Sequence, residues 1–332
     1  MRMGKITQTM WKRSVKKQIH VDKSGKCSTP EWEENCSSME LDEGQGQQMV
    51  WSSAVVGDGT EKAGYYAAIK AAGDLAAKGI HPSALSAQIL FTAEAEENDL
   101  KNLTVELRKA CEELHLKFAG FQAESVPFVK KTVVHVTATG YGKEKTESDL
   151  QAGNEILLCG YAGLEGTLRI LDEAEAELSH RFVPTFLEKT KKLKEKLACP
   201  EQILEVAAEG KPGLAVRQIG SGGILAALWE LAEAEKIGFE VSFSKIALKQ
   251  ETVEICEFYQ LNPYLITSAG SFLIVTDRGE ESVELLKKCG VDVTRIGIVK
   301  DQNARELTGG EEVRYLDRPA ADELMKWWEK RC

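Results

Sequence analysis

The chain has 332 residues, of which 43% are hydrophobic and 28% charged, and its formal net charge is -10. This length can bury two hydrophobic cores, so we expect two domains. The acidic balance argues against broad nucleic-acid or anionic-membrane binding, and no apolar run approaches the roughly 18–20 residues that span a bilayer. Residues 1–20 lack the apolar core of a signal peptide, so a cytoplasmic location is expected.

The first 150 residues are predicted to form an α+β domain, preceded by a lead-in over residues 1–47. Residues 5–19 have the pattern of a basic amphipathic helix, and 20–47 that of a polar loop with little regular structure. Strands are predicted at 49–56, 84–92, 117–122 and 132–140, and helices at 61–78 and 96–115. This β-α-β-α-β-β order is typical of a ferredoxin-like unit.

The second domain is predicted to span 151–317, followed by a helix and tail over 318–332. Its strands are expected at 155–160, 214–219, 239–243, 271–276 and 291–299, alternating with helices. The stretch 172–209 is predicted to be helical, with breaks at Pro184 and Pro200. Alternating strands and helices favour a C-terminal α/β domain with a mixed sheet covered by helices.

A glycine turn at the centre of this domain is a candidate anion site. An apolar strand ends at Ile219, a helix begins at Ile224, and between them stand Gly220, Ser221, Gly222 and Gly223. Backbone N–H groups at such a helix start, together with the helix dipole, favour a phosphate. The turn is neither a P-loop nor a GxGxxG motif. The alternative is a turn that only packs a helix onto a sheet.

Four stretches together resemble one known superfamily. They are AGNEILLCGYAGLEGTLRIL (152–171), GGILAALWELAEAEKIGFEV (222–241), KIALKQETVEICEFYQLNPYLITSAGSFLIV (245–275) and RPAADEL (318–324). They are similar to the aminoimidazole ribonucleotide synthase (PurM-like) superfamily, and most of all to its hydrogenase maturation carbamoyl dehydratase branch. The resemblance implies a homodimer in which two N-terminal sheets pair into a barrel. It also implies an ATP site with Mg²⁺ on the phosphates.

The resemblance further implies four acidic metal-ligand positions, which fall on Asn35, within Ser52-Ser53-Ala54, on Asp74 and on Gln218. Only Asp74 keeps a carboxylate, so it is the candidate metal ligand, unless it is an ordinary surface acid of its helix. One carboxylate among amides cannot neutralise a metal–triphosphate cluster as several carboxylates do, because Mg²⁺ prefers hard oxygen donors. Replacement ligands from nearby loops would be Glu31, Glu33, Glu34 or Asp58.

Two further candidate positions come from the same resemblance. Gly120 and Glu124 remain from a Gly-Gly-His-Thr-Glu-like segment, as a nucleotide-binding glycine and a second metal ligand, although Glu124 could equally be a strand-end acid. The dehydratase relatives end in a mobile tail with a reactive cysteine. Here the last residues are Lys330, Arg331 and Cys332, so Cys332 is a candidate catalytic thiol or a chance terminal cysteine.

These observations support three interpretations. The preferred one is a superfamily member with weakened or lost Mg-ATP catalysis that binds a small-molecule ligand or a partner protein. The alternative is an active ATP-dependent enzyme that phosphorylates a carbonyl or amide oxygen of a small substrate or of a carbamoylated Cys332. The third is a hydrogenase maturation role through Cys332, with a maturation partner protein. In each case the expected assembly is a homodimer, with neither nucleic acid nor membrane as partner.

Overall fold

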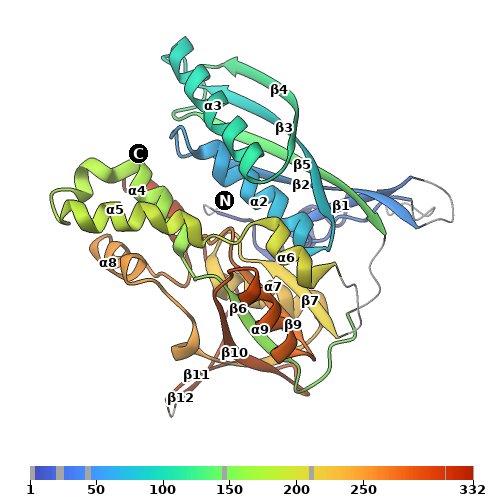
Figure 1. The fold of residues 1–332 in the computed structure, drawn as a ribbon. Helices are drawn as coiled ribbons and strands as arrows, with labels where there is room; N and C mark the ends of the chain where they lie inside the picture. The colour runs from blue at the N-terminus through green and yellow to red at the C-terminus, as the bar shows by residue number, and fades with distance from the viewer. Residues whose placement is uncertain are drawn as a thin grey trace.

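The protein is described here by a computed structural model that covers residues 4–19, 26–41, 46–143, 148–208, 213–310 and 312–331. Within these ranges the strands form two sheets, of five and seven strands, with helices packed on and between them (Figure 1). The predicted fold class is therefore confirmed: an α+β N-terminal part is followed by an α/β part with a mixed sheet.

The N-terminal sheet has the order β1-β2-β5-β3-β4, and only its β3–β4 pair is parallel. Its strands are β1 (Cys36–Glu40), β2 (Gln47–Val56), β3 (His81–Phe91), β4 (Lys117–Ser125) and β5 (Val133–Lys143). Helices α2 (Ala63–Ala77) and α3 (Glu97–Glu113) accompany them, and α1 (Gln8–Ser14) precedes the sheet. The prediction of an irregular 20–47 was wrong at β1. That strand carries two serines and forms because its backbone pairs with β2, with Cys36 opposite Ser52.

The C-terminal sheet has the order β12-β11-β8-β10-β6-β9-β7, antiparallel except for the pair β8–β11. Its strands are β6 (Glu155–Cys159), β7 (Leu214–Gln218), β8 (Gly238–Ser242), β9 (Phe272–Thr276), β10 (Val293–Lys300), β11 (Arg305–Gly309) and β12 (Glu312–Tyr315). The hairpin β11–β12 was not predicted from the sequence.

The helices of this half are α4 (Leu164–Leu178), α5 (Pro184–Lys192), α6 (Pro200–Ala207), α7 (Gly223–Glu235), α8 (Gln250–Phe258), α9 (Gly279–Lys288) and α10 (Glu323–Glu329). The predicted breaks are confirmed, because Pro184 and Pro200 begin α5 and α6, where the fixed φ of proline suits the first helical position. The last helix starts at Glu323, five residues later than predicted, because Asp322 caps it.

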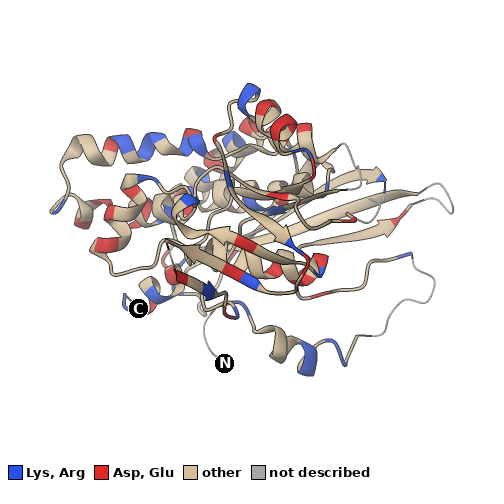
Figure 2. Ribbon diagram, turned by 90° about the horizontal axis from the view of Figure 1, so that it is seen from below, with Lys and Arg blue, Asp and Glu red and all other residues tan. Residues whose placement is uncertain are grey.

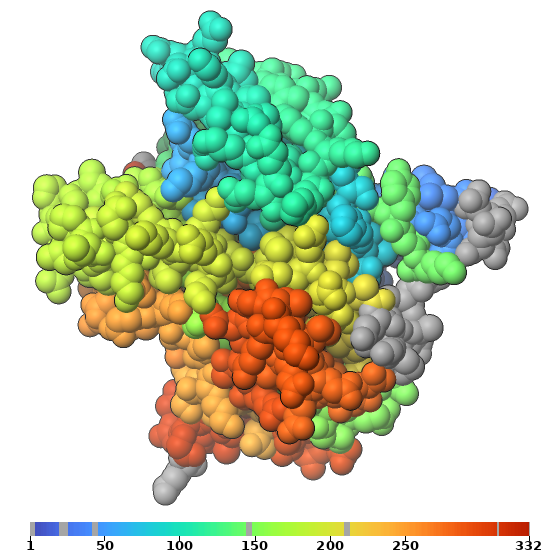
Figure 3. All heavy atoms as spheres, in the orientation of Figure 1, coloured from blue at the N-terminus to red at the C-terminus, as the bar shows by residue number. Residues whose placement is uncertain are grey.

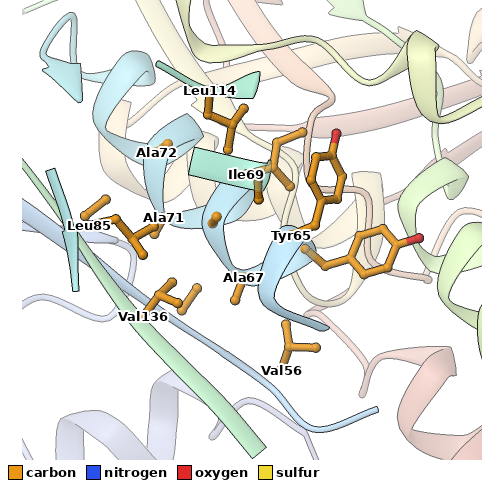
Figure 4. Packing of buried hydrophobic residues seen from close by; sticks show 14 of the residues in the cluster. Val56, Tyr65, Ala67, Ile69, Ala71, Ala72, Leu85, Leu114 and Val136 are labelled. Carbon is orange, nitrogen blue, oxygen red and sulfur yellow. The ribbon is translucent and has the colours of Figure 1, made fainter. Parts of the chain in front are cut away.

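Helix α2 lies between the two halves of the molecule. It packs on β2 and β5 on one side and on α6 and β7 on the other. All its residues except Lys70 are buried, and most are alanine, glycine or tyrosine. Figure 4 shows Ala67 and Ala71 of α2 facing Val56, Leu85 and Val136 of the sheet. Small side chains on every face let backbone approach from both sides, and the space-filling view shows the two halves in continuous contact (Figure 3).

Charged side chains are distributed over both halves. Figure 2 shows acidic and basic residues interspersed along the helices and strands in view. This pattern is that of an ordinary solvated surface. Across the described ranges, no helix combines the length and the apolar character needed to cross a membrane.

Candidate functional site

Asp74 stands at the centre of the candidate site. Its side chain lies near the C-terminal end of α2, and the residue is 6% exposed. Three side chains donate hydrogen bonds to its carboxylate: Asn35 Nδ2 at 3.2 Å, Ser52 Oγ at 3.2 Å and Gln218 Nε2 at 2.9 Å. These three residues and Asp74, here called the Asp74 cluster, come from the four places where the resemblance implied metal ligands, with Ser52 as the member from Ser52-Ser53-Ala54. The alternative that Asp74 is a surface acid is wrong.

Gln218 joins the C-terminal domain to this cluster. It is the last residue of β7, and its amide has three partners. Nε2 donates to the Lys70 carbonyl at 2.7 Å as well as to Asp74, and Oε1 accepts from Gly270 N at 3.1 Å. Because Nε2 has two acceptors and Oε1 has one donor, the orientation of the Gln218 amide is fixed. The approach needs Gly73, because a Cβ there would lie 2.4 Å from Gln218 Oε1.

The donor set does not fit magnesium. Asn35 and Gln218 turn amide nitrogens toward Asp74, the Ser52 hydroxyl donates to it, and the remaining oxygen of Gln218 is already bonded. A magnesium ion needs several oxygen ligands, usually including more than one carboxylate when it carries a triphosphate. Among the described residues, no three His, Cys, Asp or Glu side chains are grouped so that they could hold a metal ion.

The acidic residues proposed as replacement ligands are mostly engaged elsewhere. Glu31 pairs with Lys16 at 2.9 Å, Glu34 with Lys78 at 2.6 Å, and Asp58 with Arg169. Glu34 also accepts hydrogen bonds from the backbone N–H groups of Asn35 and Cys36, so it holds the start of β1 in place. The carboxylates of Glu31, Glu34 and Asp58 therefore have structural partners of their own, whereas Glu33, among the described residues, is seen to accept a hydrogen bond only at its backbone carbonyl, from Arg217.

Burial governs the electrostatics of the Asp74 cluster. Desolvation raises the pKa of Asp74, although the hydrogen bonds from Gln218 and Ser52 and the charges of Lys70 and Arg217 oppose this shift. Burial also raises the pKa of the neighbouring Cys36 thiol, and the charge of Asp74 adds to that effect. A raised pKa stabilises the thiol over the thiolate, so Cys36 is not an activated nucleophile.

The glycine turn begins two residues after Gln218, and the N–H groups of Gly222 and Gly223 have acceptors within the chain. Gly222, at φ +85, caps α7 and donates its N–H to Asp322 Oδ2 at 2.7 Å. Gly223 N donates to the Gly220 carbonyl at 3.1 Å, and Leu225 N to the Tyr264 carbonyl at 3.3 Å. Asp322 was not predicted as a site residue. An Asp just before a helical pattern is a known N-cap signal, but nothing local connects it to a turn 100 residues earlier.

The N-terminal segment packs beside this turn. Lys5 Nζ bonds Glu230 of α7 at 2.5 Å and lies 4.4 Å from the Trp32 ring centroid. Trp32 Nε1 donates to the Ile6 carbonyl at 2.7 Å. Arg217 bonds Glu230 from the other side, at 2.5 Å. This network ties the N-terminal segment to α7 and, through Arg217, to β7.

The remaining candidates lie apart from Asp74. Gly120 and Glu124 are on β4, an edge strand separated from β2 by β5 and β3, and Glu124 is exposed. Cys332 is outside the described residues. Its neighbour Arg331 lies against α4 and α8, where it bonds Glu177 and stacks 4.3 Å from the Trp327 ring centroid.

Residues 151–310 match the family model described as AIR synthase related protein, C-terminal domain. A hydrogenase expression/formation protein of Methanocaldococcus jannaschii is 23% identical over 221 residues, which cover 65% of this chain and 63% of that protein. The chain thus spans less than two thirds of the length of this curated relative. The predicted resemblance to the AIR synthase superfamily and its hydrogenase maturation branch is confirmed.

Two solved structures show the same fold. One is a chain in the crystal structure of the HypE–HypF complex, with a TM-score of 0.68, 18% identity, and coverage of 85% of this chain and 93% of that one. The other is hydrogenase maturation protein HypE in complex with ATP, with a TM-score of 0.64, 15% identity, and coverage of 86% and 89%.

Proposed function

We propose that this chain, whose residues 151–310 match the family model for the AIR synthase related C-terminal domain, is a HypE-like protein that has lost Mg-ATP catalysis and acts by binding. The observation that carries the proposal is the saturated Asp74 cluster. Its single carboxylate is held by neutral donors, and the amide orientation of Gln218 is set by three partners. A metal ion would have to displace all three donors from Asp74 and would gain one carboxylate.

The alternative is an active enzyme that uses Mg-ATP to phosphorylate a carbonyl or amide oxygen of a small substrate or of a carbamoylated Cys332. What favours it is the shared fold with a HypE that was crystallised with ATP. In that case Asp74, with Glu124, would hold magnesium, and Gly120 and the turn Gly220–Gly223 would contact the nucleotide. It is less well supported, because it needs replacement ligands while Glu31, Glu34 and Asp58 are paired elsewhere.

The proposed binding function includes a second copy of the chain. Helices α2 and α3 cover one face of the N-terminal sheet (Figure 1), and the more exposed side chains of β2 and β5 lie on the other face. On it Val55 is 59% and Tyr141 54% exposed. Exposed apolar residues on a sheet face mark an interface, and pairing of two such faces would give the barrel that the resemblance implies. A mass of two chains in sedimentation equilibrium is expected, and a monomer would contradict it.

Two further partners belong to the proposal. A maturation partner protein is supported by the likeness to a chain of the HypE–HypF complex. A small-molecule ligand is supported by a cavity of about 540 Å³ in the C-terminal half, walled by Leu225, Phe243, Leu265, Leu307 and Leu316. Apolar cavities of a few hundred Å³ are the usual form of ligand sites.

The test is isothermal titration of ATP into the full chain, with and without magnesium. We expect no magnesium-dependent binding at micromolar concentrations and no magnesium-dependent release of phosphate. Micromolar binding that requires magnesium would show that replacement ligands exist, and the enzyme interpretation would then replace this one. The small substrate need not be known for this measurement, because it concerns the nucleotide alone.

A further inference from the structure

The start of α7 has the geometry of an anion site that is already filled. Helix α7 is 13 residues long, and its dipole places partial positive charge at Gly222. Gly222 cannot be replaced without strain, because its φ is +85 and a Cβ would lie 2.8 Å from the Ala226 Cβ. Its N–H donates to Asp322 Oδ2 at 2.7 Å, so a carboxylate stands where a bound phosphate would accept the same hydrogen bond.

The same carboxylate serves a second element. Asp322 Oδ1 accepts from Leu324 N at 2.8 Å and thereby caps α10. The residue is 2% exposed, and no Lys or Arg of the described chain forms an ion pair with it. Its charge is therefore balanced mainly by backbone N–H groups and by the positive end of α7, which is how helix starts hold phosphate and other anions.

Apolar packing keeps Asp322 at the turn. Leu324 is 0% and Trp327 2% exposed, and both belong to the cluster formed with α4 and α8. The backbone adds a hydrogen bond from Glu323 N to the Leu265 carbonyl at 3.2 Å. On the other side Gly4 lies against Ala321, close enough that a Cβ would meet the Ala321 Cβ at 3.3 Å. Leu324 and Trp327, which come shortly after Asp322 in the chain, are both anchored in this cluster. The carboxylate of Asp322 is therefore held in place without a ligand.

We propose that Asp322 is an internal anion of the glycine turn and excludes external phosphate from Gly222. The inference rests on the proposed function, since it concerns the phosphate half of the same nucleotide site, whereas the Asp74 cluster concerns the metal half. Together the two features would disable a nucleotide site twice, once by removing metal ligands and once by supplying an occupant from the chain itself.

The test uses inorganic phosphate without magnesium and the full-length chain. Asp322→Ser keeps an N-cap for α10 but is too short to reach Gly222, so it frees the turn. We expect the serine variant to bind phosphate at least ~10-fold more tightly than the unaltered chain, because a helix start with a free N–H attracts anions. Asp317→Ser is the matched control, because it removes an exposed carboxylate from the same segment and should leave phosphate binding unchanged.

Equal phosphate binding by the Asp322→Ser variant and the unaltered chain would overturn the inference. If the serine variant does not fold, the amide resonance of Gly222 in the unaltered chain decides. It should not move when phosphate is added, and a saturable shift would overturn the inference. Because magnesium and ATP are absent, these results are independent of the ATP titration. Magnesium-dependent hydrolysis would remove the proposed function, while the phosphate measurement would still report on Asp322 alone.

Discussion

Two buried clusters hold carboxylates in opposite ways. In the Asp74 cluster, one carboxylate is surrounded by two amides and a hydroxyl. In the Arg169 cluster, which consists of Arg169, Asp58 and Glu165, two carboxylates share one guanidinium. Asp58 and Glu165 side chains are 0% and 2% exposed, and Trp328 stacks 5.3 Å from Arg169.

The two clusters differ in what stabilises their buried carboxylates: a counter-charge in the Arg169 cluster and hydrogen bonds in the Asp74 cluster. Burial acts against the charge of Arg169, but Asp58 and Glu165 outweigh it and raise the pKa of the guanidinium, so it stays charged at any ordinary pH. Both carboxylates of that cluster depend on this charge. Among the described residues Asp74 has no ion-pair partner, and it is held by neutral donors that can also bond a protonated acid or an amide. The Arg169 cluster needs its ions, whereas the Asp74 cluster needs only its hydrogen bonds.

The largest effect is expected at Arg169. Replacement Arg169→Met keeps the length of the side chain but leaves Asp58 and Glu165 buried without a counter-charge, so the free energy of unfolding should fall by about 3–5 kcal/mol. Urea unfolding measures this. Lys191→Met is the control, because Lys191 pairs with Glu175 and Glu188 at the surface and should cost less than about 1 kcal/mol. A loss no greater than that of the control would contradict the comparison.

A smaller effect is expected when the Asp74 cluster is given a second charge. Gln218→Asp places a carboxylate beside Asp74 and removes the donor to Lys70 O, at a cost of about 1–3 kcal/mol. Gln218→Asn is the matched control, because it shortens the side chain equally and adds no charge. Magnesium at millimolar concentration should recover stability only in the aspartate variant. Equal unfolding midpoints for the two variants, with and without magnesium, would contradict this prediction. They would show that a second negative charge does not destabilise the Asp74 cluster.

The sequence made part of this arrangement predictable. The alanine-rich pattern places the helix 61–78, but Lys70, Asp74 and Lys78 recur at four-residue spacing as a polar stripe would, so the burial of Asp74 did not follow from the pattern. Its partners could not be inferred locally, because Ser52, Asn35 and Gln218 lie 22, 39 and 144 residues away in the chain. The family resemblance supplied those positions.

Other features depend on tertiary contacts that no local pattern encodes. The strand β1 exists because β2 offers a backbone edge, and its own residues carry no strong strand signal. The local sequence predicts Asp322 as a helix cap, which matches its hydrogen bond from Leu324 N. The second hydrogen bond, which Asp322 accepts from Gly222 N, requires α10 to pack beside α7. Sequence patterns therefore indicated the elements and their burial, while the identity of the groups that meet was set by packing between distant segments.

The smallest effect is expected for Asp74→Asn, and it is the most specific. Asn35 and Gln218 both donate to Oδ1 of Asp74, and Ser52 donates to Oδ2. An asparagine with its oxygen at the Oδ1 position keeps the first two bonds, and its NH₂ can donate to the Ser52 hydroxyl, which is both donor and acceptor. The free energy of unfolding at pH 7 should change by less than about 1 kcal/mol.

The pH dependence of this difference has a definite sign. Burial raises the folded-state pKa of Asp74 above its ordinary value of 3.8, so the folded chain binds this proton more tightly than the unfolded chain. Stability from protonated Asp74 is therefore fully present below that ordinary value and is lost as pH rises through the raised pKa. Urea unfolding of both proteins from pH 3.5 to pH 7 should show the unaltered chain losing stability relative to Asp74→Asn as pH rises. The Asn variant is the reference that cancels the titration of Asp58 and Asp322. The opposite slope would mean that the ionised carboxylate is the favoured form, as a metal ligand requires, and would return the enzyme interpretation to first place.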